Sequence, residues 1–582
     1  MAPHSLRSIV ARLLLRRLRT ARSVAHLAYR LHGRKTGLID RRGRWTYRQL
    51  QDRAWRLHAW MHAQGVRRRD VVFTWLPETG EQYETRLATY ENGTIFASLH
   101  QHLPPEAALD MLERLRPAVF VHDPALSRSI LATVRERWPA LRLLALGTAY
   151  ESALANHPPL AGREPVHEDD IFALHMTSGT TGLPKAIGYS HRKYLDSVRL
   201  ISEAIDFSRP KSQQDVNMLG LPLTGPGSGM VLPTLLSGAA LLMPENFRAQ
   251  TLAGLIEQHR VTRAYLSPSA IIDLLDDPRL ATQDLSSLTH VPYGSEMMPA
   301  AKIAEALRRF GPIFQQGYGC FEALPPITWL LPGEHVDAHG EPVGHDILSS
   351  VGRVIPGVDV VIRDDDFEPL PAGATGLITV RTPVRFTGYW KDPARTAETL
   401  RGDWVVMGDV GYFDPQGYLH VLGRIADRVQ RQGHWINPRE VEEVAHGHPA
   451  VKETCLVQHG GDAVLVVSPR HAWKERLASA DHPGPAALET ELRAHLAAQL
   501  PPTLLPDRVQ LVADIPRSFL NKMLRREVRA LLDEATAPVW RTTARAEAPT
   551  IGPVPIAPPA ALTRAPMADA PAIATARLRA GA

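Results

Sequence analysis

The sequence predicts an α/β protein with a large N-terminal domain of doubly wound sheets, a β-rich subdomain, and a small mobile α+β C-terminal domain. Three observations lead to this prediction. Short apolar runs alternate with longer helical segments up to about residue 270, which is typical of parallel sheets covered by helices. From residue 350 the runs become shorter and lie between turns. The 582 residues also exceed what one hydrophobic core holds, so at least two domains are expected.

The expected elements follow one another in the order that a doubly wound fold requires. After a strand and a helix within residues 37–65, strands are expected at 71–76, 118–121, 143–146, 171–174, 239–243 and 263–267, with helices at 81–90 and 252–259. Shorter strands at 358–363 and 376–381 belong to the β-rich part. We therefore divide the chain into an extension (1–35), a large domain (36–425), a small domain (426–536) and a tail (537–582). The tail is rich in proline and alanine and has few large apolar residues, so we expect it to be disordered.

Residues 1–35 hold nine lysine and arginine residues and no acidic residue. Apolar side chains recur among them near helical spacing, which predicts a basic amphipathic helix. One interpretation is peripheral contact with an anionic membrane surface. The other interpretations are a helix that packs on its own domain and a basic arm without fixed structure.

The composition excludes several classes of protein. With 44% hydrophobic and 22% charged residues the chain resembles a globular protein, and its net charge of +5 gives no reason to expect a nucleic-acid partner. No apolar run reaches the length of a membrane span, and the N-terminus lacks the features of a signal peptide. Cys320 and Cys455 are far apart in the sequence, so we expect no disulfide and a cytoplasmic protein.

The segment TSGTTGLPK at residues 177–185 is the strongest functional signal, because hydroxyls and glycines alternate after an apolar strand and a lysine closes the loop. Glycines allow successive backbone N–H groups to point into one concavity that binds phosphate oxygens. The hydroxyls add donors and Lys185 adds a positive charge. The spacing differs from that of a Walker loop, which disfavours a P-loop NTPase. A surface turn rich in glycine and threonine is the alternative.

A second segment, YGCFE at residues 318–322, combines groups that suit a nucleotide and its metal ion. The ring of Tyr318 offers a flat apolar face for a purine, and the carboxylate of Glu322 offers a hard oxygen ligand for Mg²⁺. Gly317 and Gly319 allow close approach of the backbone to a ligand. By itself this segment is better explained as a strand end flanked by glycines, with a solvated glutamate.

These two segments and several later ones resemble the adenylate-forming superfamily, which includes acyl-CoA synthetases, luciferases and the adenylation domains of peptide synthetases. The further matching segments are VPYGSE at 291–296, MGDVG at 407–411, GR at 423–424, a glycine-bearing strand at 433 and IPRSFLNK at 515–522. The resemblance covers roughly residues 37–535 and is greater to fatty and aryl acyl-CoA ligases than to peptide-synthetase domains.

The resemblance implies ATP, Mg²⁺ and coenzyme A as ligands and assigns a role to many residues. The implied ATP- or AMP-binding residues are Thr177, Ser178, Gly179, Thr180, Thr181, Gly182, Lys185, Gly294, Ser295, Glu296, Gly317, Tyr318, Gly319, Glu322, Asp409, Arg424 and Lys522. Asp409 would bind the ribose, Glu322 would bind Mg²⁺, and the implied catalytic residues are Lys522, Glu322 and Thr177. The residues implied to border the acyl chain or the thiol are Thr224, Gly229, Tyr293, Gly294 and Gly433.

The chain departs from the family pattern at four places. Phe321 replaces a threonine whose hydroxyl contacts the α-phosphate in relatives, a loss of about 1 kcal/mol or more. Ala426 takes the place of the polar hinge residue, and Asn521 takes the place of a glycine beside Lys522. The link between the apolar runs at 451–457 and 463–467 is shorter than in relatives.

We therefore expect an enzyme that activates a carboxylic acid, fatty or otherwise apolar, as an acyl-adenylate with release of pyrophosphate and then transfers the acyl group to coenzyme A. One alternative is an adenylating enzyme that does not use coenzyme A, and instead loads an acyl carrier protein or lets an internal hydroxyl close on the activated acid. Another is a non-catalytic nucleotide or acyl binder, and a third is a membrane scaffold that acts through residues 1–35.

Overall fold

The computed structural model describes residues 17–177, 184–204, 215–324, 326–479, 484–518 and 522–533, which all belong to one compact unit of the chain. The expected tail at 537–582 and the first half of the basic extension lie outside the described residues. Within the described residues, no helix is both long enough and apolar enough to cross a membrane.

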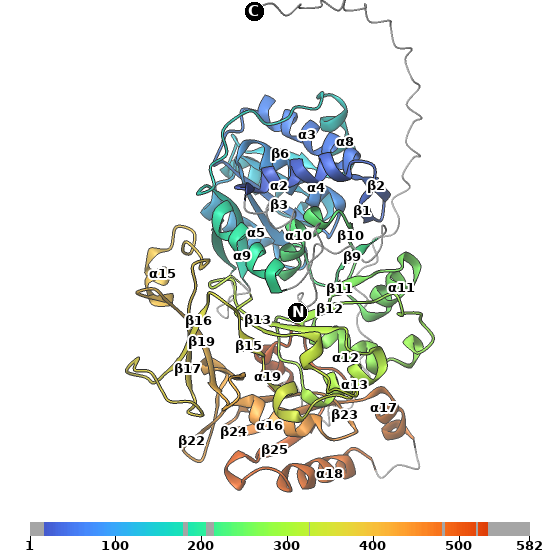
Figure 1. Ribbon diagram of the computed structural model, residues 1–582, viewed down its shortest axis with the longest axis vertical. Helices are drawn as coiled ribbons and strands as arrows, with labels where there is room; N and C mark the ends of the chain where they lie inside the picture. The colour runs from blue at the N-terminus through green and yellow to red at the C-terminus, as the bar shows by residue number, and fades with distance from the viewer. Residues whose placement is uncertain are drawn as a thin grey trace, which may run out of the picture. The chain divides into compact units, whose positions relative to one another are not determined.

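A six-stranded sheet forms the N-terminal part of the fold. In spatial order its strands are β6 (Arg142–Ala145), β5 (Val119–His122), β3 (Val71–Leu76), β4 (Ile95–His100), β7 (Ile171–Thr177) and β8 (Lys185–Ser190). Alternate residues of β3 face opposite sides, so Phe73 packs towards α5 (Pro105–Leu115), and Val72 towards α3 (Tyr47–Ala63) and α8 (Thr148–Ala155) (Figure 1). The predicted strand at 71–76 is confirmed. The sheet is parallel except at β8, whose antiparallel pairing with β7 the alternation of elements did not predict.

Two further sheets complete the α/β part. The second contains β11 (Arg263–Tyr265), β9 (Val216–Leu219), β10 (Ala240–Leu242), β1 (Thr36–Asp40) and β2 (Gly43–Thr46), and the third contains β12 (Val291–Gly294), β13 (Phe314–Tyr318), β14 (Thr328–Leu330) and β15 (Arg353–Val354). A parallel bridge between Leu266 and Tyr293 links them. Their helices are α11 (Ala249–His259), α12 (Pro268–Asp276), α13 (Ala300–Phe310) and α14 (His345–Ser349), and the other helices of this part are α6 (Pro124–Ser127), α7 (Leu131–Arg137), α9 (His191–Ala204) and α10 (Val231–Ser237).

The helix α4 (Gly80–Asn92) is buried along its whole length although it carries several charged residues. Arg42 lies 2.7 Å from the carboxylate of Asp40 and 2.8 Å from that of Glu84, and Arg53 also lies 2.8 Å from Glu84. Buried charges are tolerated when they are paired in this way. The ion pairs thus fix α4 against β1 and α3.

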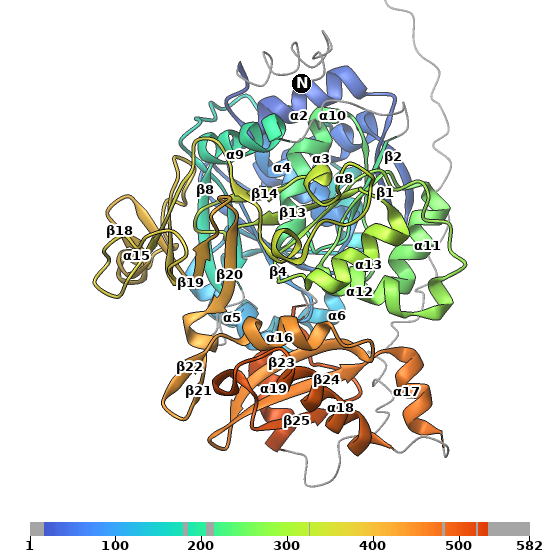
Figure 2. The same ribbon diagram turned by 60° about the horizontal axis from the view of Figure 1, so that its bottom comes forward.

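The β-rich part and the C-terminal part have hydrophobic cores of their own. The β-rich sheet contains β16 (Asp359–Arg363), β17 (Gly376–Arg381), β19 (Trp404–Phe413), β18 (Leu400–Arg401) and β20 (Leu419–Arg424), with α15 (Pro393–Thr399) beside it. The C-terminal part contains β21 (Val429–Arg431), β22 (His434–Ile436), α16 (Pro438–His446), β23 (Val451–His459), β24 (Asp462–Pro469), α17 (His471–Ala478), α18 (Pro485–Ala497), β25 (Arg508–Leu511) and α19 (Arg525–Asp533) (Figure 2). The two hydrophobic cores of the C-terminal part contain only residues between 429 and 532. The domain boundary at 425/426 remains a prediction.

A helix of the basic N-terminal stretch packs into the fold. The helix α2 (Ala21–His32) starts at a Thr20 cap and buries Val24, Ala25 and Tyr29 against α3, α4 and α10. Residues 21–32 are therefore a helix packed on its own domain, which is one of the interpretations of this basic stretch, and the boundary at 35/36 stays a prediction. Of the two arginines in this stretch, Arg30 is exposed, whereas Arg22 binds backbone carbonyl oxygens of its own domain.

Two glycines allow β12 and β13 to approach each other closely. Gly294 and Gly317 are partners in the parallel register, and a Cβ on Gly294 would collide with the carbonyl oxygen of Gly317. A Cβ on Gly317 would lie 2.7 Å from the Trp329 ring. Both glycines are therefore required by strand packing, whatever ligand lies beyond them.

We predict that Tyr29→Ala lowers the free energy of unfolding by about 3 kcal/mol, because it leaves a cavity under α2. Leu31→Ala on the same helix is the control, since the Leu31 side chain is 58% exposed, and it should change stability by less than about 0.5 kcal/mol. Urea unfolding followed by circular dichroism measures both. Equal losses in the two variants would show that α2 is not part of the core.

We predict that Gly294→Ala destabilises the protein by about 1–3 kcal/mol, because the backbone oxygen of Gly317 cannot move away from the added methyl group. Gly229→Ala is the matched control, since a Cβ there meets no atom within 4 Å. Thermal unfolding of both variants is the measurement. A Gly294→Ala protein as stable as the control would contradict the close approach of β12 and β13.

Candidate active site

The predicted phosphate loop closes a hairpin between β7 and β8. Thr177 ends β7 and Lys185 begins β8, and the two are partners in the antiparallel register. Ser178, Gly179, Thr180, Thr181 and Gly182 lie outside the described residues, as does the side chain of Thr177. The Lys185 Nζ lies 5.5 Å from the centroid of the Tyr389 ring, and burial, with the nearby charge of Arg395, lowers the pKa of the lysine.

Glu322 lies beside this lysine. The hydroxyl of Tyr389 donates a 2.7 Å hydrogen bond to Glu322 Oε1, and the backbone N–H of Phe386 donates to the Glu322 carbonyl oxygen at 2.8 Å. The charge of Glu322 also acts on Lys185. The structure thus brings the predicted residues Lys185 and Glu322 together around Tyr389, which no motif in the sequence singled out.

A second cluster forms around Asp409. Tyr318, at the end of β13, donates a 2.7 Å hydrogen bond from its hydroxyl to Asp409 Oδ2. Arg424, the register partner of Asp409 on β20, places its Nε 3.6 Å from Oδ1. Burial raises the pKa of Asp409 against the opposing charge of Arg424. Gly319 directly follows β13.

The C-terminal lysine reaches the same cluster. Lys522 sits on a narrow loop in which the Ser518 N–H donates to the Lys522 carbonyl oxygen at 2.7 Å. Burial and the charge of Arg424 lower the pKa of Lys522 to about 8, while Glu296 and Asp409 act in the opposite direction. The structure therefore brings Lys522, Asp409, Arg424 and Glu296 together, and Asn521 lies outside the described residues.

The turn after β12 is strained and contains a polar group without a partner. Ser295 has a φ of 69°, which is rare outside glycine, and its buried hydroxyl has no hydrogen-bond partner within the described part of the chain. Glu296 Oε1 accepts hydrogen bonds from the Ser269 N–H at 3.1 Å and from its hydroxyl at 2.6 Å, at the first turn of α12. The structure thus gives Glu296 a helix-capping contact, and its place among the nucleotide-binding residues stays a prediction.

The predicted acyl- and thiol-binding residues lie in three different environments. Thr224 is buried in the segment 221–230, where Glu78 accepts a 3.0 Å hydrogen bond from the Leu223 N–H. Burial raises the pKa of Glu78 to about 7. Tyr293 packs in the hydrophobic core, with its hydroxyl 3.0 Å from His335 Nε2. Gly433, at φ 82°, forms with Gln432 the two-residue turn between β21 and β22, where positive φ is required.

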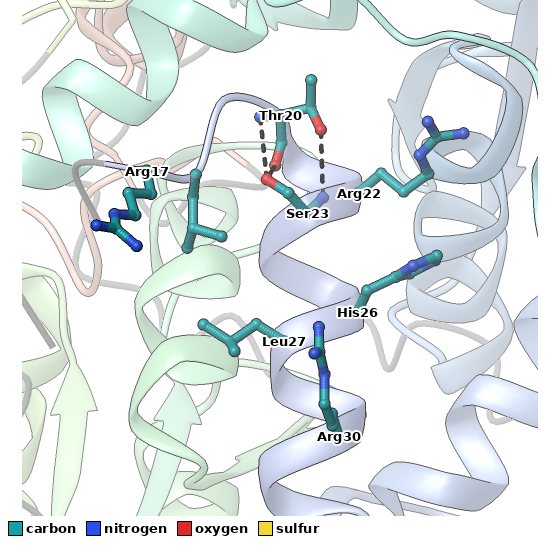
Figure 3. Close-up of a pocket in the computed structure, with 8 residues that line it drawn as sticks. Arg17, Thr20, Arg22, Ser23, His26, Leu27 and Arg30 are labelled. Atoms are coloured by element: carbon teal, nitrogen blue, oxygen red, sulfur yellow. Dashed lines mark hydrogen bonds between the residues drawn. The ribbon is translucent and has the colours of Figure 1, made fainter. Parts of the chain in front are cut away.

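A separate pocket of about 470 Å³ lies along the first turns of α2 and is lined by residues within 17–30 (Figure 3). Arg22 donates 2.8 Å hydrogen bonds to the carbonyl oxygens of Glu91 and Glu164, and His26 lies 3.0 Å from the Glu91 carboxylate. The basic groups of Arg22 and His26 in this pocket are thus bound to the protein itself. The pocket shares no lining residue with the clusters around Glu322 and Asp409.

Comparison with known proteins agrees with this geometry. The family model for the AMP-binding enzyme matches residues 26–390, and the model for the AMP-binding enzyme C-terminal domain matches residues 440–522. The medium/long-chain fatty-acid–CoA ligase FadD8 of Mycobacterium tuberculosis is 31% identical over 398 residues, which cover 67% of this chain and 66% of the ligase, just under two thirds of its length.

Other relatives are similar over more of their length. A feruloyl-CoA synthase from Amycolatopsis sp is 31% identical over 83% of this chain and 93% of its own, and the fatty acid–[acyl-carrier-protein] ligase ScoC of Streptomyces coeruleorubidus is 29% identical over 83% and 91%. The structure of the anthranilate CoA ligase AuaEII with anthranoyl-AMP matches 88% of this chain and 96% of its own, with a TM-score of 0.77 at 22% identity. The chain therefore belongs to the family of AMP-binding enzymes, as the motifs predicted.

Proposed function

We propose that the protein activates an apolar carboxylic acid with ATP and transfers the acyl group to coenzyme A. In the first half-reaction a carboxylate oxygen attacks the α-phosphorus of ATP, and the bond to pyrophosphate breaks, which leaves an acyl-adenylate. In the second, a thiol sulfur attacks the acyl carbon, AMP leaves, and the thiol proton passes to water. The observation that carries this proposal is the convergence of Lys522 on Asp409 and Arg424.

Each cluster supplies one part of this chemistry. Asp409 would accept hydrogen bonds from the ribose hydroxyls, and the Tyr318 ring, tethered through its hydroxyl, would offer its face to adenine. Lys185 would bind the phosphates that the hairpin loop surrounds. Lys522, charged below its pKa, would offset the charge that develops at the α-phosphate during the displacement.

The acidic residues fit a magnesium ion that is shared with the nucleotide. Among the described residues, no group of three or more histidine, cysteine, aspartate and glutamate side chains gathers as a metal site. Mg²⁺ commonly takes one or two carboxylates together with substrate phosphates, and Glu322, whose Oε1 accepts the hydrogen bond from Tyr389, offers such a carboxylate. Glu322 would therefore hold the ion, which when bound neutralises phosphate charge.

A rotation of the C-terminal part about residues 424–427 would separate the two half-reactions. In the described conformation that part is held to α13, because the Lys302 Nζ donates to the Val451 carbonyl oxygen at 2.5 Å and the Ala300 N–H donates to Glu443 at 2.7 Å. Lys452 and Arg470 add ion pairs with Asp273 and Glu305 across the same interface, so the rotation would have to break all of these contacts in each cycle. Ala426 at the hinge supplies no polar pivot.

A second candidate is transfer to an acyl carrier protein without coenzyme A. The similarity to the carrier-protein ligase ScoC over 83% of the chain favours it. The link between β23 and β24 also favours it, because Gly460 and Gly461, at φ 58° and 90°, form a two-residue turn where relatives carry a longer loop.

The test is ATP–pyrophosphate exchange with octanoate, palmitate, benzoate and ferulate, followed by product analysis with coenzyme A and with a phosphopantetheinylated carrier protein. We expect exchange with at least one acid and an acyl-CoA product. Exchange with a product on the carrier protein alone would support the second candidate. No exchange with any acid would refute acid activation.

We predict that Lys522→Ala lowers the exchange rate about 100- to 1,000-fold, because one charge at the reacting phosphate is lost. In the unmodified protein the exchange rate should fall as the pH rises through about 8, the lowered pKa of Lys522. Below that pH the Lys522 side chain is an ammonium ion, and above it the charge is lost. Lys474→Ala is the control, because Lys474 pairs with Asp514 at 3.2 Å on the surface. Bound AMP without any exchange, and no change on Lys522→Ala, would indicate a non-catalytic nucleotide binder.

A further inference from the structure

His175 lies in the strand that leads into the phosphate loop, and no motif marks it. It is two residues before Thr177 on β7, and residues two apart on a strand share one face at about 6.6 Å. It therefore lies one strand repeat before the point where β7 ends. It is only 4% exposed.

The surroundings of the imidazole connect two parts of the site. Its Nδ1 is 3.2 Å from the hydroxyl of Ser228, which belongs to the segment 221–230 that is expected to border the acid. Its ring centroid is 5.4 Å from that of Phe321, the residue directly before Glu322. His175, near the end of β7, thus lies where the glutamate segment and the acyl segment meet.

One nitrogen of this buried ring has no partner. His175 Nε2 is buried and makes no hydrogen bond within the described part of the chain, although buried polar atoms in proteins are almost always bonded. Burial and the charge of Arg86 lower the pKa of His175 to about 3, so the ring is neutral at physiological pH. When the Ser228 hydroxyl donates to Nδ1, the single ring proton is on Nε2, which is then a free donor.

We infer that His175 binds the carboxylate of the acid substrate through Nε2–H and so holds the attacking oxygen beside the phosphate loop. This inference rests on the proposed acid activation. Attack requires a carboxylate oxygen about 3–3.5 Å from the α-phosphorus, and therefore between the phosphate loop and the acyl segment. The rings of Phe321, Tyr189 and Tyr194 lie around the imidazole.

Two substitutions separate the two ring nitrogens. His175→Asn keeps an amide near Nδ1 for Ser228 and removes the group at Nε2, whereas His175→Gln extends an amide to the position of Nε2. Exchange kinetics should show an increase of about 10- to 100-fold in the KM for the acid in His175→Asn, because a hydrogen bond to a charged group is lost. The KM for ATP should stay within about twofold, and His175→Gln should recover much of the loss.

His122 provides a matched control. It is a buried histidine of β5 in the same sheet, and its Nδ1 lies 2.8 Å from the hydroxyl of Ser127. Its strand is separated from β7 by β3 and β4, so His122→Asn removes a comparable imidazole away from the site. The KM values for acid and ATP should both stay at the wild-type level in this variant.

The kinetics are measured with whichever of octanoate, palmitate, benzoate and ferulate gives the fastest exchange in the unmodified protein, together with thermal unfolding of each variant. A wild-type KM for the acid in His175→Asn, or equal changes in His175→Asn and His122→Asn, would overturn the inference. If His175→Asn does not fold, Ser228→Ala tests the inference in its place. Loss of the hydrogen bond to Nδ1 should raise the KM for the acid, by a smaller factor than His175→Asn would. An unchanged KM for the acid in Ser228→Ala counts against the inference. An unmodified protein without exchange would instead refute the proposed function and the inference with it.

Discussion

The buried carboxylate of Asp409 is the interaction on which the site depends. Tyr318 donates a hydrogen bond to it from β13, Arg424 faces it from β20, and its charge acts on Lys522 of the C-terminal part. The Arg424 side chain is 58% exposed, so its ion pair with Asp409 adds little stability, and the hydrogen bond from Tyr318 is the contact that links β13 to β19. The contacts of Asp409 thus connect the third sheet, the β-rich sheet and the C-terminal loop, and the same contacts assemble the site.

Each separately packed part of the protein contributes one side chain to the proposed site. Lys185 begins the last strand of the six-stranded sheet, Glu322 follows a strand of the third sheet, Asp409 lies in the β-rich sheet, and Lys522 lies in the C-terminal part. Such a site is formed only when all of these parts are packed. The close approach of β12 and β13 at Gly294 helps to make this packing possible.

The interior of the large domain is specified by charge as well as by apolar packing. Arg42 and Arg53 converge on Glu84 of the fully buried α4, and Arg42 also binds Asp40 of β1. Buried ion pairs add little net stability compared with apolar side chains of the same volume, but an alternative packing would leave these charges unpaired. They therefore favour a single position for α4 between α3 and β1, close to the sheets that carry the site.

The sequence by itself determined the fold class, the strand at 71–76 and the family, and it singled out Lys185, Glu322, Asp409 and Lys522, whose roles stay predictions, because strand periodicity and motif chemistry are local properties of the chain. Only the tertiary structure decided that residues 21–32 belong to the core, that Tyr389 binds Glu322, that Glu296 caps α12, and that His175 meets Ser228 and Phe321. These four outcomes depend on contacts between segments that are 15 or more residues apart, and neither hydrophobic pattern nor charge in any one segment specifies its distant partner.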